Sequence, residues 1–267
     1  MSEDLNAETE NMNSNEILQP LLNTRFEQLE NGISADRIVE LLDYLIQALP
    51  GNGVKVVSLI GGAASGKSTI ALALVEDLTA DGCSVDVLAT DDYVRGDRTW
   101  RWEQFEGKAD VDPIGKYDFV LLNAKLAAIK GNSDPALTVA VPSYNQETGL
   151  AIDAGEENYL HRIGPVNIVI VEGDFDAVKQ PDLTIFLHVP DDQRLEFRRT
   201  RDAVSRGGDM EKTTNSFNFR QRTQHFPHTL VAAKKADIII YTDASSPEWT
   251  FSLYQQKPKR QFKDGTG

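Results

Sequence analysis

The stretch GGAASGKST, at residues 61–69, constrains the fold of this chain more than any other. It satisfies the pattern G-x-x-x-x-G-K-[ST] and lies between an apolar run, VKVVSLI (54–60), and a helical pattern that extends from Gly66 to about Ala80. A strand, a glycine-rich loop and a helix in this order form a phosphate-binding loop (P-loop), because the backbone N–H groups and the helix N-terminus attract a polyphosphate. We therefore expect a nucleoside triphosphate to contact Gly61, Gly62, Ala63, Ala64, Ser65, Gly66, Lys67, Ser68 and Thr69.

Two side chains of this motif are expected to act on the phosphates and on a metal ion. Lys67 neutralises the β- and γ-phosphate oxygens, and the Ser68 hydroxyl coordinates Mg²⁺. A second metal ligand should follow a neighbouring apolar strand, and Glu172 comes directly after VNIVIV (166–171). Two alternatives stay open. The first is that the motif is only a glycine-rich turn with a solvated lysine, and the second is that Glu172 is a simple acid at the end of a strand. The pattern favours ATP as the phosphoryl donor, together with Mg²⁺.

Further apolar runs lie at residues 84–90, 166–171, 182–189 and 236–242, and helical patterns separate them. Strands that are apolar on both faces and alternate with helices indicate a parallel sheet that is covered on both sides. We expect an α/β fold of the P-loop NTPase type, with a doubly wound parallel sheet, helices on both faces and an arginine-rich helix around 191–206.

The expected P-loop domain covers residues 51–245. An amphipathic helix precedes it at 34–50, with Ser34 as its N-cap and apolar residues at i, i+3, i+4 and i+7. Residues 1–33 are rich in Asn and Glu and are expected to form a flexible tail; docking of its apolar island, ILQPLL, on the body or on a partner is left open. Residues 246–267 are expected to form a flexible, basic C-terminal tail.

The composition limits the partners and the compartment. The chain has 267 residues and a formal net charge of −14, and so acidic a protein repels nucleic acid and anionic membranes. No apolar run approaches the roughly 20 residues of a membrane span. The single cysteine, Cys83, excludes an intramolecular disulfide and suits a reducing cytoplasm. We expect a cytoplasmic protein that binds neither nucleic acid nor membranes, and a homo-oligomer is left open.

A cluster of charge, DDYVRGDR, follows the apolar run at 84–90. Asp91 and Asp92 should lie at the carboxyl edge of the sheet, where doubly wound folds bind ligands. A carboxylate there can align an acceptor hydroxyl and take its proton. We expect Asp92 to support the turn, and its use as the base is left open as the alternative. The charged residues behind them bind an acceptor phosphate or pair with each other: Arg95, Asp97 and Arg98.

Seven segments in one order resemble the phosphoribulokinase/uridine kinase family over residues 54–242: GGAASGKST, TDDYVRGDR, VDPIGKYDF, VPSYNQETG, IVIVEGDF, RRTRDAVSRGGDME and KKADIII. The resemblance implies an ATP-dependent kinase that moves the γ-phosphate to a hydroxyl group of a small acceptor. In such a kinase Asp91 matches the aspartate that acts as catalytic base or orients the acceptor hydroxyl. Asp112 and Tyr144 match acceptor-site residues, and Tyr93 and Arg95 lie in the same motif as Asp91 and are also expected to bind the acceptor.

The resemblance further implies an arginine lid that closes over the phosphates: Arg198, Arg201 and Arg206. Arg201 is expected to act in catalysis together with Lys67 and Asp91, whereas Arg198 and Arg206 bind ATP. The alternative is that these arginines form a solvated helix face. Trp100 and Trp102 stack on a base or sugar, or they pack in the core or the lid.

The motifs depart from both subgroups of the family. Val94 and Gln146 stand where phosphoribulokinase patterns carry histidine, and Pro113 directly follows Asp112 where nucleoside kinases carry FDHP. From the chain length we expect a uridine- or cytidine-type nucleoside as acceptor. The alternatives are a sugar phosphate, as in phosphoribulokinases, or another small alcohol such as pantothenate or a sugar. A nucleotide-dependent switch without transfer is the alternative from another class, but it has no use for the acceptor residues and the lid together.

Overall fold

The computed structural model describes residues 13–258 except 107, 109, 132–133, 135–137, 146–147, 153–160, 207–208 and 244–249. Its main sheet has the strand order β1-β11-β10-β9-β2-β8-β3. The bounds of these strands are Phe26–Ile33 (β1), Lys55–Gly61 (β2), Val85–Ala89 (β3), Ile168–Gly173 (β8), Leu183–His188 (β9), Ile238–Asp243 (β10) and Thr250–Gln256 (β11). From β10 to β3 the strands run parallel, and β11 and β1 add to one edge antiparallel.

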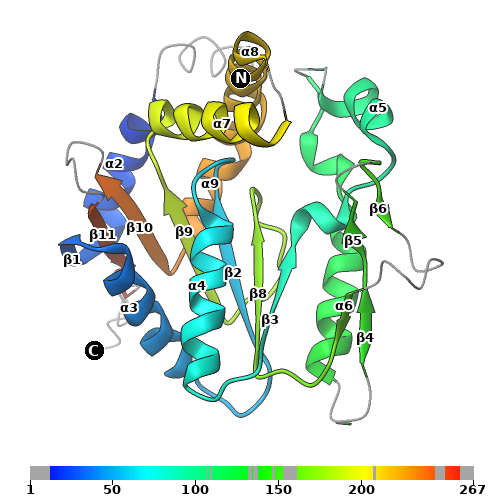
Figure 1. The fold of residues 1–267 in the computed structure, drawn as a ribbon. Helices are drawn as coiled ribbons and strands as arrows, with labels where there is room; N and C mark the ends of the chain where they lie inside the picture. Colours follow the sequence, from blue (N-terminus) through cyan, green and yellow to red (C-terminus); the bar gives the residue numbers. More distant parts are fainter. Residues whose placement is uncertain are drawn as a thin grey trace, which may run out of the picture.

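Helices and short strands complete the fold (Figure 1). The longer helices are α2 (Ser14–Arg25), α3 (Ala35–Gln47), α4 (Lys67–Ala80), α6 (Phe119–Gly131), α7 (Asp191–Arg206) and α8 (Met210–Arg220). The shorter ones are η1 (Thr90–Tyr93), α5 (Arg98–Arg101), η2 (Trp102–Glu106), η3 (Pro113–Lys116), η5 (Gln221–Thr229), α9 (Leu230–Ala232) and η6 (Ala233–Lys235). Two small antiparallel pairs join β4 (Val139–Val141) to β7 (His161–Ile163), and β5 (Ser143–Tyr144) to β6 (Ala151–Ile152).

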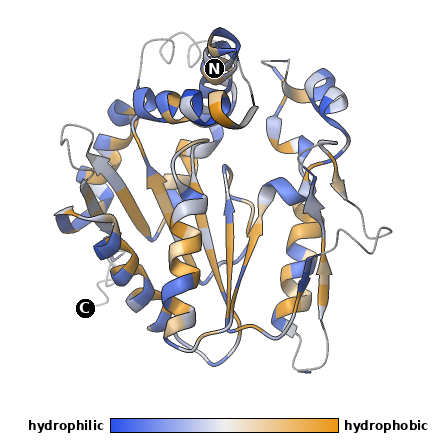
Figure 2. Ribbon diagram, viewed as in Figure 1, coloured by the Kyte–Doolittle hydropathy of each residue, from blue (hydrophilic) through white to orange (hydrophobic). Residues whose placement is uncertain are grey.

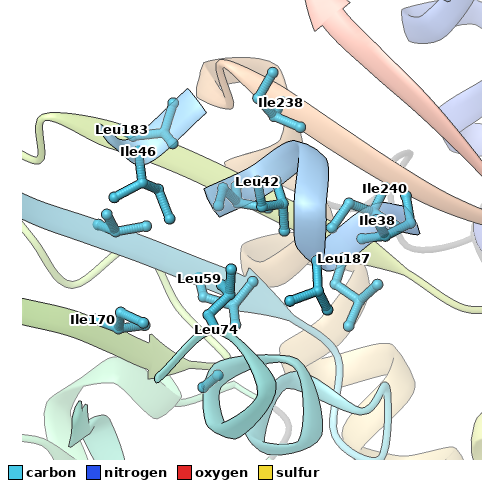
Figure 3. Packing of buried hydrophobic residues seen from close by; sticks show 14 of the residues in the cluster. Ile38, Leu42, Ile46, Leu59, Leu74, Ile170, Leu183, Leu187, Ile238 and Ile240 are labelled. Carbon is cyan, nitrogen blue, oxygen red and sulfur yellow. The ribbon is translucent and has the colours of Figure 1, made fainter. Parts of the chain in front are cut away.

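Both faces of the main sheet are covered by helices. Because side chains alternate along a strand, β2 presents Val57 and Leu59 to one face, and Val56 and Ile60 to the other. The first face packs against α3 and α4, in the cluster drawn in Figure 3: Ile38, Leu42, Ile46, Leu59, Leu74, Ile170, Leu183, Leu187, Ile238 and Ile240. The second face packs against α6 through Leu122, Leu126 and Ile129, and against α2 through Leu18 and Leu22. The central parallel strands β2, β8 and β9 are accordingly mostly apolar (Figure 2), and the predicted doubly wound α/β fold is confirmed.

The structure differs from the expectation of flexible tails at both ends of the chain. Residues 14–33 form α2 and β1, and residues 250–256 form β11, which pairs with β10 and β1. The island ILQPLL docks on the body, since helical spacing brings Leu18 and Leu22 to one side of α2, and each is at most 2% exposed. A capping box at Asn13 fixes the start of this helix. Other parts of the two expected tails, 1–12, 246–249 and 259–267, lie outside the described residues.

The parallel strands bring three chain segments to one edge of the sheet. Leu59 of β2 and Ala89 of β3 both pair with Glu172 of β8, so these strands end side by side. The P-loop follows β2, the motif at Asp91 follows β3, and the acidic turn after Glu172 follows β8. This edge therefore collects the three segments from which the sequence predicts phosphate, acceptor and metal binding. Within the described part of the chain, no helix is both long and apolar enough to cross a membrane.

If α2 is part of the folded body, removal of a buried side chain from it must destabilise the whole protein. Leu22→Ala deletes a side chain that is 2% exposed, and we expect the free energy of unfolding to fall by about 2–5 kcal/mol. The matched control is Leu29→Ala in β1, because Leu29 is 43% exposed and its truncation should change the free energy by less than about 0.5 kcal/mol. Urea denaturation followed by circular dichroism measures both variants. Equal stability of the Leu22→Ala variant and the unsubstituted chain would show that α2 is a dispensable tail.

Candidate active site

The P-loop connects the end of β2 to the N-terminus of α4. Gly66 caps α4 in the left-handed conformation, with φ of 88°, which a residue with a Cβ adopts only under strain. Ser68 and Thr69 are exposed, whereas Lys67 is only 8% exposed. The hydroxyls are thus open to a ligand, and the lysine points back under the loop.

The Lys67 ammonium lies at the centre of the site. It donates to the carbonyl oxygens of Gly61 and Gly62, each at 3.0 Å, and to Asp174 Oδ1 at 2.9 Å. Burial acts to raise the pKa of Asp174, but the Lys67 charge and hydrogen bond outweigh it and lower the pKa. The sequence analysis did not single out Asp174. A signal was available, because an acid two residues beyond Glu172 follows the same strand end.

Ser68 and Glu172 meet beside this ion pair. The Ser68 hydroxyl donates to Glu172 Oε1 at 2.9 Å. Desolvation raises the pKa of Glu172, although the Lys67 charge and the Ser68 hydrogen bond act against it. A hydroxyl and a carboxylate at one point form the type of oxygen donor set that Mg²⁺ prefers. The two residues that the sequence proposes as metal ligands are therefore brought together.

Asp91 lies in η1, directly after β3. Its side chain is reached by solvent but has protein on most sides, and the Tyr117 hydroxyl donates to its Oδ1 at 3.4 Å. This desolvation, together with the charge of Asp174, raises the pKa of Asp91, and the charges of Lys116 and Lys67 offset part of the rise. A carboxylate with a raised pKa binds a proton more readily than an ordinary aspartate does.

The two residues after Asp91, Asp92 and Tyr93, have different surroundings. Asp92 Oδ1 accepts a hydrogen bond from the backbone N–H of Tyr144 at 2.7 Å, which ties η1 to β5. This contact is the turn-supporting type that the sequence analysis favoured. Tyr93, expected to bind the acceptor, is only 1% exposed and packs in the cluster beneath α6. It is therefore not accessible to an acceptor, because η1 is a 3-10 helix with three residues per turn, in which residues two apart point in different directions.

The charged residues that follow are mostly engaged in local contacts. Arg95 Nη2 lies 3.6 Å from Asp118 Oδ1, and the Arg95 side chain is 49% exposed. Asp97 caps α5 and accepts a hydrogen bond from Trp100 N at 2.7 Å. Arg98 lies against Gly149, where a Cβ would come within 2.4 Å of Arg98 Cγ.

The two tryptophans differ in their surroundings. Trp100 packs over Gly96, where a Cβ would lie 2.5 Å from its ring, and contacts Phe105 edge to face at 5.3 Å between ring centroids. Packing is therefore the alternative that the structure supports for Trp100. Trp102 is 58% exposed.

Arg101 is a buried residue beside Tyr144 that the sequence analysis missed. It is 5% exposed and donates to the carbonyl oxygens of Gly96 at 2.6 Å and Gly149 at 2.8 Å. It also donates to the Tyr144 hydroxyl at 3.3 Å and lies over the ring of Tyr144, 5.7 Å from the centroid. Arg101 thus joins the loop after β3 to the loop after β5 and fixes Tyr144, which is half-buried.

Asp112 and Lys116 bracket η3. The Asp112 side chain is 64% exposed and caps η3 by accepting from Ile114 N at 2.9 Å; His228 Nε2 lies 3.8 Å from its Oδ1. Its carboxylate is therefore available at the surface but already has a structural role. Lys116, which the sequence analysis did not single out, is 3% exposed, and its charge lowers the pKa values of both Asp91 and Asp174.

The arginines expected in the lid do not share one environment. Arg198 is 7% exposed and donates to Ser216 Oγ at 3.1 Å, and burial together with the charge of Arg220 lowers its pKa to about 10. Arg201 is 47% exposed and donates to Asp202 Oδ1 at 3.0 Å. Arg206 is the last residue of α7, and its side chain lies outside the described part of the chain.

A pocket lies over the P-loop beneath α7, α8 and η5, and Arg198 lines it whereas Arg201 does not. Its other charged or polar lining residues include Asp174, Arg194, Arg220 and His225, with Ala63 on the P-loop side. Arg194 belongs to the arginine-rich helix, but the sequence analysis did not name it. In the sequence Arg194 does not differ from the other arginines of this helix, and only the packing of α7 on the P-loop gives it a different environment.

The chain is similar to known proteins over the segments that form this site. The chain matches the phosphoribulokinase / uridine kinase family over residues 56–244. A uridine kinase of Staphylococcus epidermidis is 29% identical over 201 residues, which cover 71% of this chain and 88% of the relative. A uridine kinase of Staphylococcus aureus is 27% identical over 190 residues, which cover 69% of this chain and 86% of the relative.

A solved structure, the YGR205w protein, is similar with a TM-score of 0.61 and 15% identity, over 85% of this chain and the whole of that chain. This likeness concerns the fold, whereas the family match spans most of the chain and all the segments that form the site. The resemblance inferred from the motifs is confirmed. The chain therefore belongs to the phosphoribulokinase / uridine kinase family and is an ATP-dependent P-loop kinase of that type.

Proposed function

We propose that this kinase transfers the γ-phosphate of ATP to a hydroxyl group of a uridine- or cytidine-type nucleoside. One observation carries the proposal: the Asp91 carboxylate, with its raised pKa, lies at the same sheet edge as the P-loop and its Lys67–Asp174 ion pair. A proton acceptor next to a phosphate-binding loop is the arrangement that phosphoryl transfer to an alcohol requires. The similar staphylococcal proteins are uridine kinases, which supports the nucleoside as acceptor.

In the proposed reaction, Asp91 accepts the proton of the acceptor hydroxyl while the hydroxyl oxygen forms a bond to the γ-phosphorus. The bond between the γ-phosphorus and the bridging oxygen breaks, and ADP leaves with that oxygen. The raised pKa of Asp91 favours proton uptake at this step. The Tyr117 hydroxyl, which donates to Asp91 Oδ1, fixes the orientation of the carboxylate.

Lys67 and the residues around it hold the phosphates. Lys67 lies among two P-loop carbonyls and Asp174, from which its ammonium reaches the β- and γ-phosphate oxygens by a change of side-chain rotamer. Ser68 and Glu172 fit Mg²⁺, because they offer an exposed hydroxyl and a carboxylate oxygen at one point. When bound, Mg²⁺ neutralises negative charge on the phosphate oxygens.

The arginines of α7 complete the proposed site. Arg198 lines the pocket over the P-loop, where a guanidinium stabilises the charge of the transferring phosphoryl group. Arg201 and Arg206 join it when the lid closes, and closure keeps water from competing with the acceptor. Asp112 and Tyr144 bind the acceptor on the side of η3 and β5, with Arg95 at the rim of this surface.

A sugar phosphate is the second candidate acceptor, and Arg101 is the observation that favours it. Among the described residues, its hydrogen-bond partners are neutral oxygens, from Gly96, Gly149 and the Tyr144 hydroxyl. A buried cation is costly unless a negative charge compensates it. An acceptor phosphate next to Tyr144 would provide that charge.

Acceptor-dependent ADP release tests the proposal directly. The purified kinase is incubated with ATP and Mg²⁺ together with uridine, cytidine, ribulose 5-phosphate, fructose or pantothenate, and a sample without acceptor is the control. We expect uridine or cytidine to stimulate ADP release the most. Stronger stimulation by ribulose 5-phosphate would favour the second candidate, and an equal, acceptor-independent rate in all samples would contradict both.

The role of Asp91 is tested by Asp91→Asn. The variant keeps the shape of the side chain but loses the proton acceptor, so we expect kcat to fall about 10²- to 10⁴-fold while ATP binds as before. The matched control is Asp92→Asn, because asparagine retains the oxygen that accepts from Tyr144 N. Its kcat should fall less than about tenfold. Steady-state kinetics and calorimetric ATP titration measure both variants, and near-normal turnover in Asp91→Asn would exclude Asp91 as the base.

A further inference from the structure

Arg194 is a buried cation between the P-loop and the start of α7. The residue is 1% exposed. Its guanidinium donates to Asp191 Oδ1 at 2.7 Å, to Gln221 Oε1 at 2.6 Å, to the Val189 carbonyl at 3.2 Å and to the Ala63 carbonyl at 3.4 Å. A buried arginine is stable only with such partners, so its position depends on each of them.

The backbone of the P-loop packs closely against the Arg194 guanidinium. At Gly62 a Cβ would lie 2.3 Å from Arg194 Nη1, so the loop comes this close only because residue 62 has no side chain. The next residue, Ala63, supplies the carbonyl that accepts from Arg194. Arg194 therefore supports the backbone from behind the segment whose N–H groups bind phosphates.

Asp191 orients Arg194, and it is itself held by the N-terminal helix. Ser14 donates twice to this carboxylate, from its backbone N–H to Oδ2 at 3.0 Å and from its hydroxyl to Oδ1 at 2.6 Å. Ser14 is fully buried. A second contact joins the same elements, since His188 Nε2 lies 2.6 Å from Asn15 Oδ1. The beginning of α2 is thus attached to the junction of β9 and α7 (Figure 1).

The family match begins at residue 56, so α2 lies outside it. The apolar contacts of Leu18, Leu22 and Phe26 hold α2 on the body independently of Ser14. The hydroxyl of Ser14 is therefore not needed to keep the helix in place. Its two donors instead fix the rotamer of a carboxylate that orients the arginine behind the P-loop.

We propose that Ser14 is a positioning residue for nucleotide binding, which acts through Asp191 and Arg194 on the P-loop. Each member fixes the next by hydrogen bonds between groups that are at least partly buried, and burial makes such bonds stronger and geometrically more demanding. Loss of the Ser14 hydroxyl lets Asp191, Arg194 and the Ala63 carbonyl shift. The phosphate-binding N–H groups then lose alignment, and ATP binds less tightly. The inference rests on the proposed binding of ATP phosphates at the P-loop.

Ser14→Ala tests this by direct binding. We expect the dissociation constant for ATP, measured by calorimetry without acceptor, to rise about three- to tenfold, as the loss of one hydrogen bond predicts. The KM for ATP should rise by the same factor, while the KM for the acceptor is unchanged. The matched control is Ser34→Ala, which removes a serine hydroxyl at the N-cap of α3 and away from α7.

Thermal unfolding separates positioning from stability. Both serine variants should lose similar, small amounts of stability, but only Ser14→Ala should weaken ATP binding. Unchanged ATP affinity in Ser14→Ala would overturn the inference and leave the proposed function intact. An unsubstituted chain that does not bind ATP would overturn both.

A double-mutant cycle shows whether Ser14 acts through Asp191. Asp191→Asn weakens the contact to Arg194, and Asp192→Asn in the same helical turn is its control, since Asp192 is exposed and accepts a hydrogen bond from Gln193 N. We expect Ser14→Ala to weaken ATP binding less in the Asp191→Asn background than in the original chain. Fully additive effects would contradict the pathway through Asp191.

Discussion

The ion pair between Lys67 Nζ and Asp174 Oδ1, 2.9 Å apart, is the interaction around which the site is arranged. It joins the first residue of α4 to the turn after β8, and two P-loop carbonyls share the same ammonium. A cation buried at this depth needs such compensation. The pair fixes the distance between the P-loop and the acidic strand end, and so places Ser68 beside Glu172.

Around this pair the fold supplies two further supports, both buried arginines. Arg101 ties together the loops after β3 and β5. Arg194 connects the P-loop to α7 and, through Asp191, to α2. Both arginines are almost fully buried, and both bond to backbone carbonyls of glycine- or alanine-containing loops. The site is therefore held by buried cations whose partners include groups from segments distant in the sequence, such as the carbonyls of Gly149 and Ala63.

Much of the fold was predictable, because apolar strands and helical patterns alternate and the P-loop motif fixes the order of β2 and α4. The positions of Glu172 and Asp91 at the shared sheet edge were predicted from their place after strands. Arg101, Arg194 and Asp174 were not, since their roles arise from contacts between distant segments. The motif around Asp91 also led us to expect that Tyr93 binds the acceptor, but Tyr93 packs in the core. The terminal segments were misjudged because α2, β1 and β11 are short or polar, and tertiary packing stabilises them where local pattern does not.

The central claim, that Lys67 exchanges its protein partners for ATP phosphates, is tested most directly by calorimetric ATP titration of Lys67→Met. Methionine keeps a similar length and removes the charge. We predict that the dissociation constant for ATP rises at least about tenfold, as loss of charge-assisted hydrogen bonds implies, and that transfer is abolished while thermal unfolding still shows a folded protein. A folded Lys67→Met variant that binds ATP as tightly as the original chain and transfers phosphate at the same rate would contradict the account.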